Sequence, residues 1–213
     1  MLNNPGDVSG LANLASQTGV SNRVTEAILK LVASVPKSRE HQSSSPEARA
    51  RALARIAART SAGISGGAAL VPGPLGLLSL LPDMVGVWRV QTQMVSDIAA
   101  VYGKTATLTK EQMIYCLFKH TAAQLLRDVV VRSGERFLVR PVSLRMMQAL
   151  VGKISIAVGQ RTIGKTVARF APVIGAIGVG GYAYYDTSNV AKAAMALFSK
   201  EVVALEGKST DQV

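Results

Sequence analysis

Eight consecutive residues, Gly159 to Thr166, match the phosphate-binding pattern G-x-x-x-x-G-K-[ST] letter for letter. In a true P-loop the backbone amides surround the phosphates, the lysine contacts their oxygens and the hydroxyl residue holds Mg²⁺. The nucleotide-binding candidates are therefore Gly164, Lys165 and Thr166. The motif requires a buried strand before it, and residues 154–158 have a suitable apolar composition. Nucleotide binding is thus one hypothesis for this chain.

The context of this motif favours a helix instead. Apolar residues before it are spaced alternately by three and four positions, which is a helical stripe: Leu144, Met147, Val151, Ile154 and Val158. Only 47 residues follow Thr166, too few for the βαβ units of a doubly wound sheet. Pro172 would also break a helix that followed the loop.

Cys116 and His120 are four positions apart and could meet on one helix face. No acid is placed nearby in the sequence to orient the histidine, and Cys116 lies beside apolar positions, so a core thiol is the favoured interpretation. One cysteine excludes an intramolecular disulfide framework, and two scattered histidines give no metal-binding pattern. We therefore expect no catalytic residue, metal or cofactor.

The composition indicates a folded, basic protein with an anionic partner. The 213 residues are 48% hydrophobic and 17% charged, and the net charge is +11. Aromatic residues make up only 5%, which disfavours nucleic acid as the partner, since base stacking needs them. Anionic membrane lipid fits better, with a protein partner or a second copy as alternatives. The candidates for contact with an anionic surface are Arg51, Arg55, Arg59, Arg136, Arg140 and Arg145.

Helical periodicity dominates the chain, and no useful β-alternation is visible. Ser45-Pro46-Glu47 is typical of a helix start, Gly103 is suited to end the helix before it, and Thr109 with Gln112 forms a capping-box pattern. The helix that follows Thr109 is expected to run through Val129 toward Gly134. The predicted fold is an all-α multi-helix bundle with two apolar hairpin segments that glycine and proline interrupt.

These two segments carry no charge over residues 60–82 and 170–185. The first is long enough to span a membrane, but its three prolines favour a broken or re-entrant hairpin. Asp83, the next residue, is expected either to cap a helix or to act in a membrane-facing turn. The candidates for lipid contact are Leu70, Leu75, Leu77, Leu78, Leu80, Leu81, Val173, Ile174 and Ile177.

The expected organisation has three parts. Residues 1–46 form an N-terminal helical segment that ends in a solvated linker, residues 47–204 form the helical domain, and residues 205–213 form a flexible tail. Met1 to Val8 lacks the basic and apolar regions of a signal peptide. We therefore expect the chain on the cytoplasmic side of the membrane.

One stretch resembles a recurrent bacterial pattern. Leu81-Pro82-Asp83, Trp88, and Ala99-Ala100-Val101-Tyr102-Gly103 resemble the EcsC family and the related domain of unknown function in YcjF-like inner-membrane proteins. The family-motif residues are Pro82, Asp83, Trp88, Tyr102 and Gly103, and Ala171-Pro172-Val173-Ile174-Gly175-Ala176 is similar to the family's second Gly-rich segment. The resemblance covers about residues 48–200. It implies an all-α, membrane-associated bacterial protein and no defined reaction.

The leading hypothesis is a non-enzymatic, membrane-associated helical protein that binds or enters an anionic bilayer through residues 61–82 and 170–185. It would lie in the bacterial cytoplasm against, or inserted in, the inner membrane. The alternatives are a soluble α-helical protein-interaction module and the P-loop nucleotide binder.

Overall fold

The computed structural model describes residues 22–31, 33, 35–69, 80–127, 129–133, 136–163 and 172–204. These residues are mostly helical, which confirms the predicted fold class. Residues 22–31 form an N-terminal helix, and five further helices follow with one 3₁₀ turn, η1 (Thr105–Thr107): α2 (Pro46–Ala69), α4 (Leu80–Val101), α5 (Lys110–Leu126), α6 (Leu144–Ile163) and α7 (Pro172–Phe198). Residues 70–79 of the first expected hairpin, 170–171 of the second, and the expected tail, 205–213, lie outside the described residues. The described part of the second segment, residues 172–185, belongs to the uninterrupted helix α7 and forms no hairpin.

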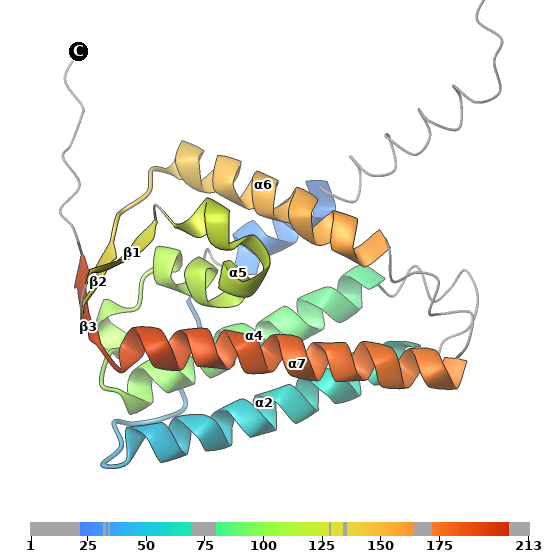
Figure 1. The fold of residues 1–213 in the computed structure, drawn as a ribbon, viewed down its shortest axis with the longest axis horizontal. Coiled ribbons are helices and arrows are strands. Elements are labelled where there is room, and N and C mark those ends of the chain that lie inside the picture. Colours follow the sequence, from blue (N-terminus) through green and yellow to red (C-terminus); the bar gives the residue numbers. More distant parts are fainter. Residues whose placement is uncertain are drawn as a thin grey trace, which may run out of the picture.

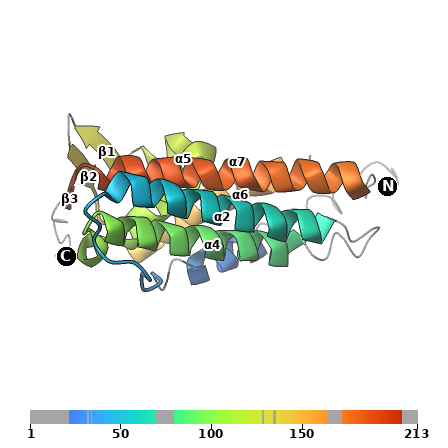
Figure 2. The same ribbon diagram turned by 90° about the horizontal axis from the view of Figure 1, so that it is seen from below.

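Helices α2, α4 and α7 lie side by side along the long axis of the molecule (Figures 1 and 2). Helix α2 runs in one direction, and α4 and α7 run in the other (Figure 1). Helix α2 begins at Pro46, as the sequence predicts, because proline fits the first turn of a helix. Helix α5 packs against α7 and carries α6 on its other side.

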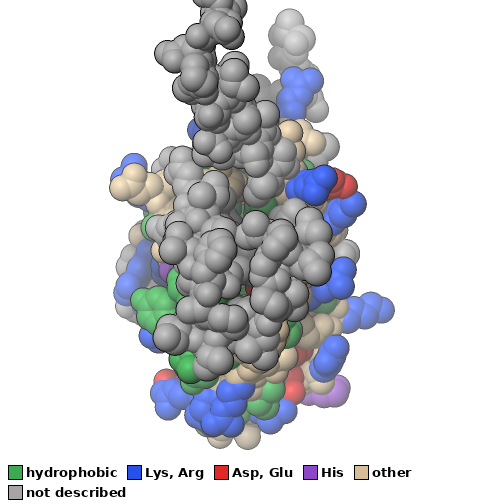
Figure 3. All heavy atoms as spheres, turned by 90° about the vertical axis from the view of Figure 1, so that its right-hand side faces the viewer, with side chains coloured by type: hydrophobic (Ala, Val, Ile, Leu, Met, Phe, Trp, Pro, Cys, Tyr) green, Lys and Arg blue, Asp and Glu red, His purple; other side chains and the backbone are tan. Residues whose placement is uncertain are grey.

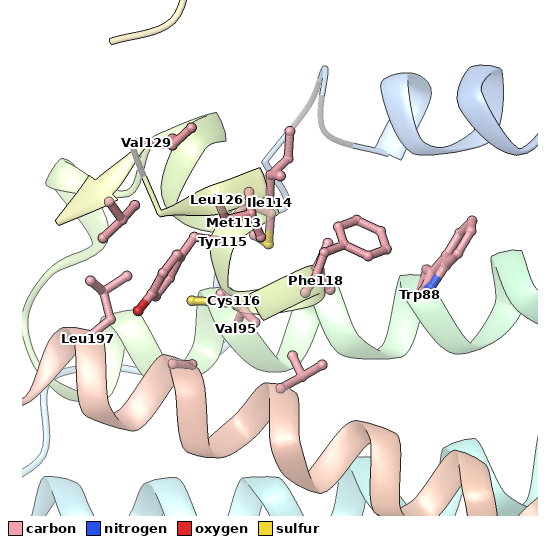
Figure 4. Packing of buried hydrophobic residues seen from close by; sticks show 14 of the residues in the cluster. Trp88, Val95, Met113, Ile114, Tyr115, Cys116, Phe118, Leu126, Val129 and Leu197 are labelled. Carbon is pink, nitrogen blue, oxygen red and sulfur yellow. The ribbon is translucent and has the colours of Figure 1, made fainter. Parts of the chain in front are cut away.

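The core lies where α4, α5 and α7 meet. Val95, Ile98, Ile114 and Leu197 are fully buried there, and burial of each such side chain contributes about 1.5–3 kcal/mol. Trp88 of α4 meets Phe118 of α5 edge to face, with ring centroids 5.8 Å apart (Figure 4). The N-terminal helix adds two buried side chains, Val24 and Ile28.

A small sheet at one end of the long axis corrects the expectation of helix up to Gly134. Helix α5 ends at Leu126, and three strands follow the order β1-β2-β3: β1 (Val130–Ser133), β2 (Arg136–Val139) and β3 (Glu201–Ala204). Strand β2 pairs antiparallel with β1 and parallel with β3. Val130 and Val131 of β1 are β-branched, which favours an extended backbone, and Phe137 and Val139 of β2 are buried in the core.

The two predicted caps are confirmed. Thr109 accepts a hydrogen bond from the Gln112 N–H at 3.4 Å, and the Gln112 side chain accepts one from the Thr109 N–H at 3.3 Å. Gly103 ends α4 with a positive φ of 70°. The Gly103 N–H donates to the Ala100 carbonyl and the Lys104 N–H to the Ala99 carbonyl, which is a Schellman motif.

The segment expected to be a solvated linker, residues 36–46, has no buried residue and is also held to α4 by hydrogen bonds. One oxygen of Asp97 accepts hydrogen bonds from the Ser38 hydroxyl and the Arg39 N–H, and the Ser96 hydroxyl donates to the Pro36 carbonyl. The segment is also tied to α2, because the Arg49 guanidinium makes two hydrogen bonds to the Glu40 carboxylate and lowers the pKa of Glu40. These bonds hold an exposed stretch of chain in a fixed position against α4 and α2.

Candidate functional site

The described parts of the two uncharged segments meet at one end of the α2–α4–α7 layer (Figure 1). We call this the uncharged end: residues 60–69 of α2, 80–88 of α4 and 172–185 of α7. A Cβ atom at Gly180 of α7 would lie 3.0 Å from the Ala62 carbonyl oxygen of α2. Small residues thus allow two segments that are distant in sequence to pack backbone against backbone.

Asp83 is the one charged residue of the uncharged end, and it is buried. The expectation that it caps a helix is wrong, because α4 already begins at Leu80 and Asp83 belongs to its first turn. The Ser65 hydroxyl of α2 donates to its carboxylate at 3.0 Å. A negative charge in the first turn is also favourable to the helix dipole. Asp83 therefore links α2 to α4 within the layer.

The surface of the uncharged end carries exposed apolar side chains. Ile177 is 73% exposed and Tyr185 is 62% exposed, and Tyr182 and Tyr184 on the same helix are also exposed. Single exposed apolar residues are common, but four within nine positions of one helix form a patch. In the view along the long axis from this end, Lys and Arg side chains are visible at the outline of the molecule (Figure 3).

The predicted lipid contacts are placed as follows. Ile177 belongs to the exposed patch, and the backbone positions of four others lie at the uncharged end: Leu80, Leu81, Val173 and Ile174. The remaining four lie outside the described residues: Leu70, Leu75, Leu77 and Leu78. Within the part of the chain that the structure describes, no helix has both the length and the apolar content needed to cross a bilayer.

The predicted basic contacts fall into two groups that the fold keeps apart. Arg51, Arg55 and Arg59 are exposed along α2, and Arg51 pairs with Glu47 one turn before it. Arg136, Arg140 and Arg145 are exposed on β2, after it and at the start of α6. The sheet and the start of α6 lie at the opposite end of the long axis from the uncharged end (Figure 1).

The segment before the P-loop match is helical. Helix α6 continues without interruption from Leu144 to Ile163, where a nucleotide-binding loop would need a strand. The alternating three- and four-residue stripe therefore predicted this element correctly, and Val151 and Ile154 of that stripe are buried. Gly164, Lys165 and Thr166 lie outside the described residues.

His120 has an acidic partner that the sequence did not reveal. Its Nε2 lies 2.7 Å from Asp186 Oδ1, and the Gln91 amide donates to Asp186 Oδ2 at 2.8 Å and to Thr187 Oγ1 at 3.1 Å. The cluster joins α4, α5 and α7. The fully buried Gln91 Oε1 and the His120 Nδ1 have no hydrogen-bond partner among the described residues.

Two observations bear on catalysis by this cluster. Cys116, the thiol one turn from His120, is fully buried, and burial raises the pKa of the Cys116 thiol far above its usual range. Among the described residues, no group of three or more His, Cys, Asp or Glu side chains is arranged to hold a metal ion. The geometry supports a role for His120, Asp186 and Gln91 in tying three helices together. The sequence offered one sign of this cluster: Gln91 is a polar residue at a position of the α4 stripe that faces the core, and such a residue needs a buried hydrogen-bond partner.

The family-motif residues all fall on α4 or its end. Pro82 is exposed in the first turn, Trp88 is buried, and Tyr102 with Gly103 forms the C-terminal cap. Burial raises the pKa of the Tyr102 hydroxyl. Comparison with protein-family models, with curated proteins and with solved structures yields no match.

Proposed function

We propose that this chain is a non-enzymatic, membrane-associated helical protein that binds an anionic bilayer through residues 61–82 and 170–185. The observation that carries the proposal is the exposure of Ile177 and Tyr185 at an end where three helices hold no charge except the buried Asp83. Apolar side chains and tyrosines suit the boundary between lipid chains and headgroups. The exposed arginines of α2 suit the anionic surface beside it, at about 1 kcal/mol per residue.

We further propose that the site of action is the cytoplasmic face of a bacterial inner membrane, and that the chain is a divergent relative of the EcsC family. Support for the family proposal is that the motif residues Pro82, Trp88 and Gly103 mark the start, the core contact and the cap of one helix. An experimental structure of an EcsC domain should then superpose on the α2–α4–α7 layer. A different helix order in that domain would refute the relationship.

The test is flotation of the purified full-length protein with liposomes, neutral against anionic, at low and high salt. We expect flotation with anionic liposomes. We expect the double variant Ile177→Glu/Tyr185→Glu to lower the partition coefficient on anionic liposomes at least about tenfold, because a carboxylate at the lipid boundary costs more than 1.4 kcal/mol. Both positions are exposed, so circular dichroism should be unchanged.

Met146→Glu is the control for position, with one added carboxylate in place of two. Met146 is 63% exposed on the first turn of α6, at the other end of the molecule, so a carboxylate there should leave flotation unchanged. Flotation that survives high salt would indicate insertion of apolar side chains, and flotation lost in salt would indicate a peripheral basic surface. Absence of flotation with every liposome would refute the proposal.

A helical protein-interaction module is the second candidate. The observation that favours it is the three exposed tyrosines within four positions of α7, since tyrosine is enriched in the core of protein interfaces. In that case the wild type should capture a protein partner in the absence of lipid, and Ile177→Glu/Tyr185→Glu should not.

A further inference from the structure

A groove of about 860 Å³ lies on the molecule between the N-terminal helix, α2 and α4. Its volume is within the range of small-molecule pockets, about 300–1,000 Å³. Apolar side chains from all three elements line it: Leu31, Leu53, Ile56, Val85, Val90 and Met94. One of them, Ile56, is 60% exposed, so part of this apolar surface is open to solvent.

Four cationic and two acidic side chains line the same groove. The two acids are already engaged: Glu26 pairs with Lys30 at 2.6 Å, and Asp97 accepts hydrogen bonds from the docked segment and from Gln93. The side chains of Arg23, Arg39 and Arg89 pair with no carboxylate among the described residues. Three guanidinium groups therefore stand at an apolar groove without an ion pair to a carboxylate of the described chain, and the Asp97 carboxylate, which only neutral donors contact, offsets part of their charge.

We propose that this groove binds one molecule of a single-chain lipid with an anionic phosphate headgroup. The acyl chain would lie on the apolar side chains, where each buried CH₂ contributes about 0.8 kcal/mol. The phosphate would lie among Arg23, Arg39 and Arg89, since a guanidinium presents paired donors to phosphate oxygens. The complementarity of charge selects an anionic headgroup over a neutral one.

This proposal goes beyond the proposed membrane association and does not depend on it. The groove reaches Thr60 and Val85, which belong to the uncharged end, so a lipid could pass to it from a bilayer. The binding itself, however, involves a single lipid and needs no bilayer. If the protein binds the single lipid but does not float with liposomes, only the membrane proposal is refuted. If it floats with liposomes but does not bind the single lipid, only the proposal of a lipid site in the groove is refuted.

The test is isothermal titration calorimetry of the full-length protein with lysophosphatidylglycerol below its micelle-forming concentration. Monoacylglycerol of the same chain length and glycerol 3-phosphate separate the contributions of chain and headgroup. We expect saturable one-to-one binding of the lysolipid, binding of the neutral lipid weaker by at least about tenfold, and no measurable binding of the headgroup alone. Equal affinity for the neutral lipid, or no binding of the lysolipid, would overturn the proposal.

Exposed side chains allow variants that leave the fold intact. Arg39→Gln/Arg89→Gln should weaken lysolipid binding by at least about tenfold, and Ile56→Gln should weaken it by a smaller factor. Arg140→Gln/Arg145→Gln is the matched control, because it removes the same charge outside the groove lining, between β2 and the start of α6. The same loss in the control as in Arg39→Gln/Arg89→Gln would show nonspecific attraction and would contradict a site in the groove.

Discussion

Cys116 lies on α5 with its side chain fully buried, and burial raises the pKa of its thiol. Only the thiolate reacts with disulfide or maleimide reagents, so both access and ionisation oppose reaction in the folded protein. We expect native protein at pH 8 to react at least about a thousandfold more slowly than protein in denaturant, where one thiol should react. Stoichiometric labelling of the native protein within minutes would contradict the buried position.

The same residue shows how far single positions could be predicted. Its apolar neighbours in the sequence correctly indicated a core thiol. The acid for His120 was not predictable, because Asp186 is 66 residues away on another helix and only the packing of α5 on α7 brings it within 2.7 Å. The prediction that Asp83 caps a helix was wrong for a local reason, because α4 begins at Leu80, three residues before Asp83.

At the scale of elements, a substitution at Gly180 tests the close contact between α2 and α7. A methyl group there would lie 3.0 Å from the Ala62 carbonyl oxygen, so Gly180→Ala must push the two helices apart. We expect a loss of about 1–2 kcal/mol in the free energy of unfolding, despite the better helix propensity of alanine. Urea denaturation followed by circular dichroism measures it.

The adjacent glycine supplies the control. A Cβ at Gly181 would meet nothing within 4 Å, and the position is exposed. Gly181→Ala should therefore raise the free energy of unfolding by about 0.5–1 kcal/mol through propensity alone. If both variants changed stability in the same direction and by the same amount, the close contact at Gly180 would be refuted.

Helix starts and ends were predictable where the signal is local. The capping box at Thr109 and the glycine cap at Gly103 each depend on residues within one turn. The strands were not predictable, because each has four residues and β3 pairs with β2 from 65 positions away. Val130-Val131-Arg132-Ser133 is too short to show the alternation of apolar and polar residues that predicts a strand, so the helical pattern before it extends the predicted helix over these residues.

At the scale of the whole molecule, the all-α class followed from periodicity, but the placement of charge did not. From the sequence, the six candidate arginines were predicted to contact one anionic surface next to the apolar segments. The fold instead places the arginines of α2 along the layer and those of β2 and α6 at the far end. Helix α7 alone, at 1.5 Å per residue, separates the two ends by about 40 Å.

This separation predicts the orientation of the molecule on a membrane. If the uncharged end binds the bilayer, Arg59 lies directly beside it, whereas Arg140 and Arg145 lie several Debye lengths away, each about 10 Å at 0.1 M salt. Arg55→Gln/Arg59→Gln should then lower the partition coefficient on anionic liposomes by about thirtyfold at about 0.1 M salt, at about 1 kcal/mol per residue. Flotation measures it.

Arg140→Gln/Arg145→Gln removes the same net charge and should change the partition coefficient by less than about twofold, because these charges are screened from a bilayer at the other end. Equal losses in the two variants would mean that the molecule lies flat, with its long axis along the surface. Loss only in the second variant would mean that the basic sheet end faces the lipid. The second result would contradict contact through Ile177 and Tyr185, since both belong to the first half of α7, which would then face away from the lipid, and the first result would contradict binding by the uncharged end alone.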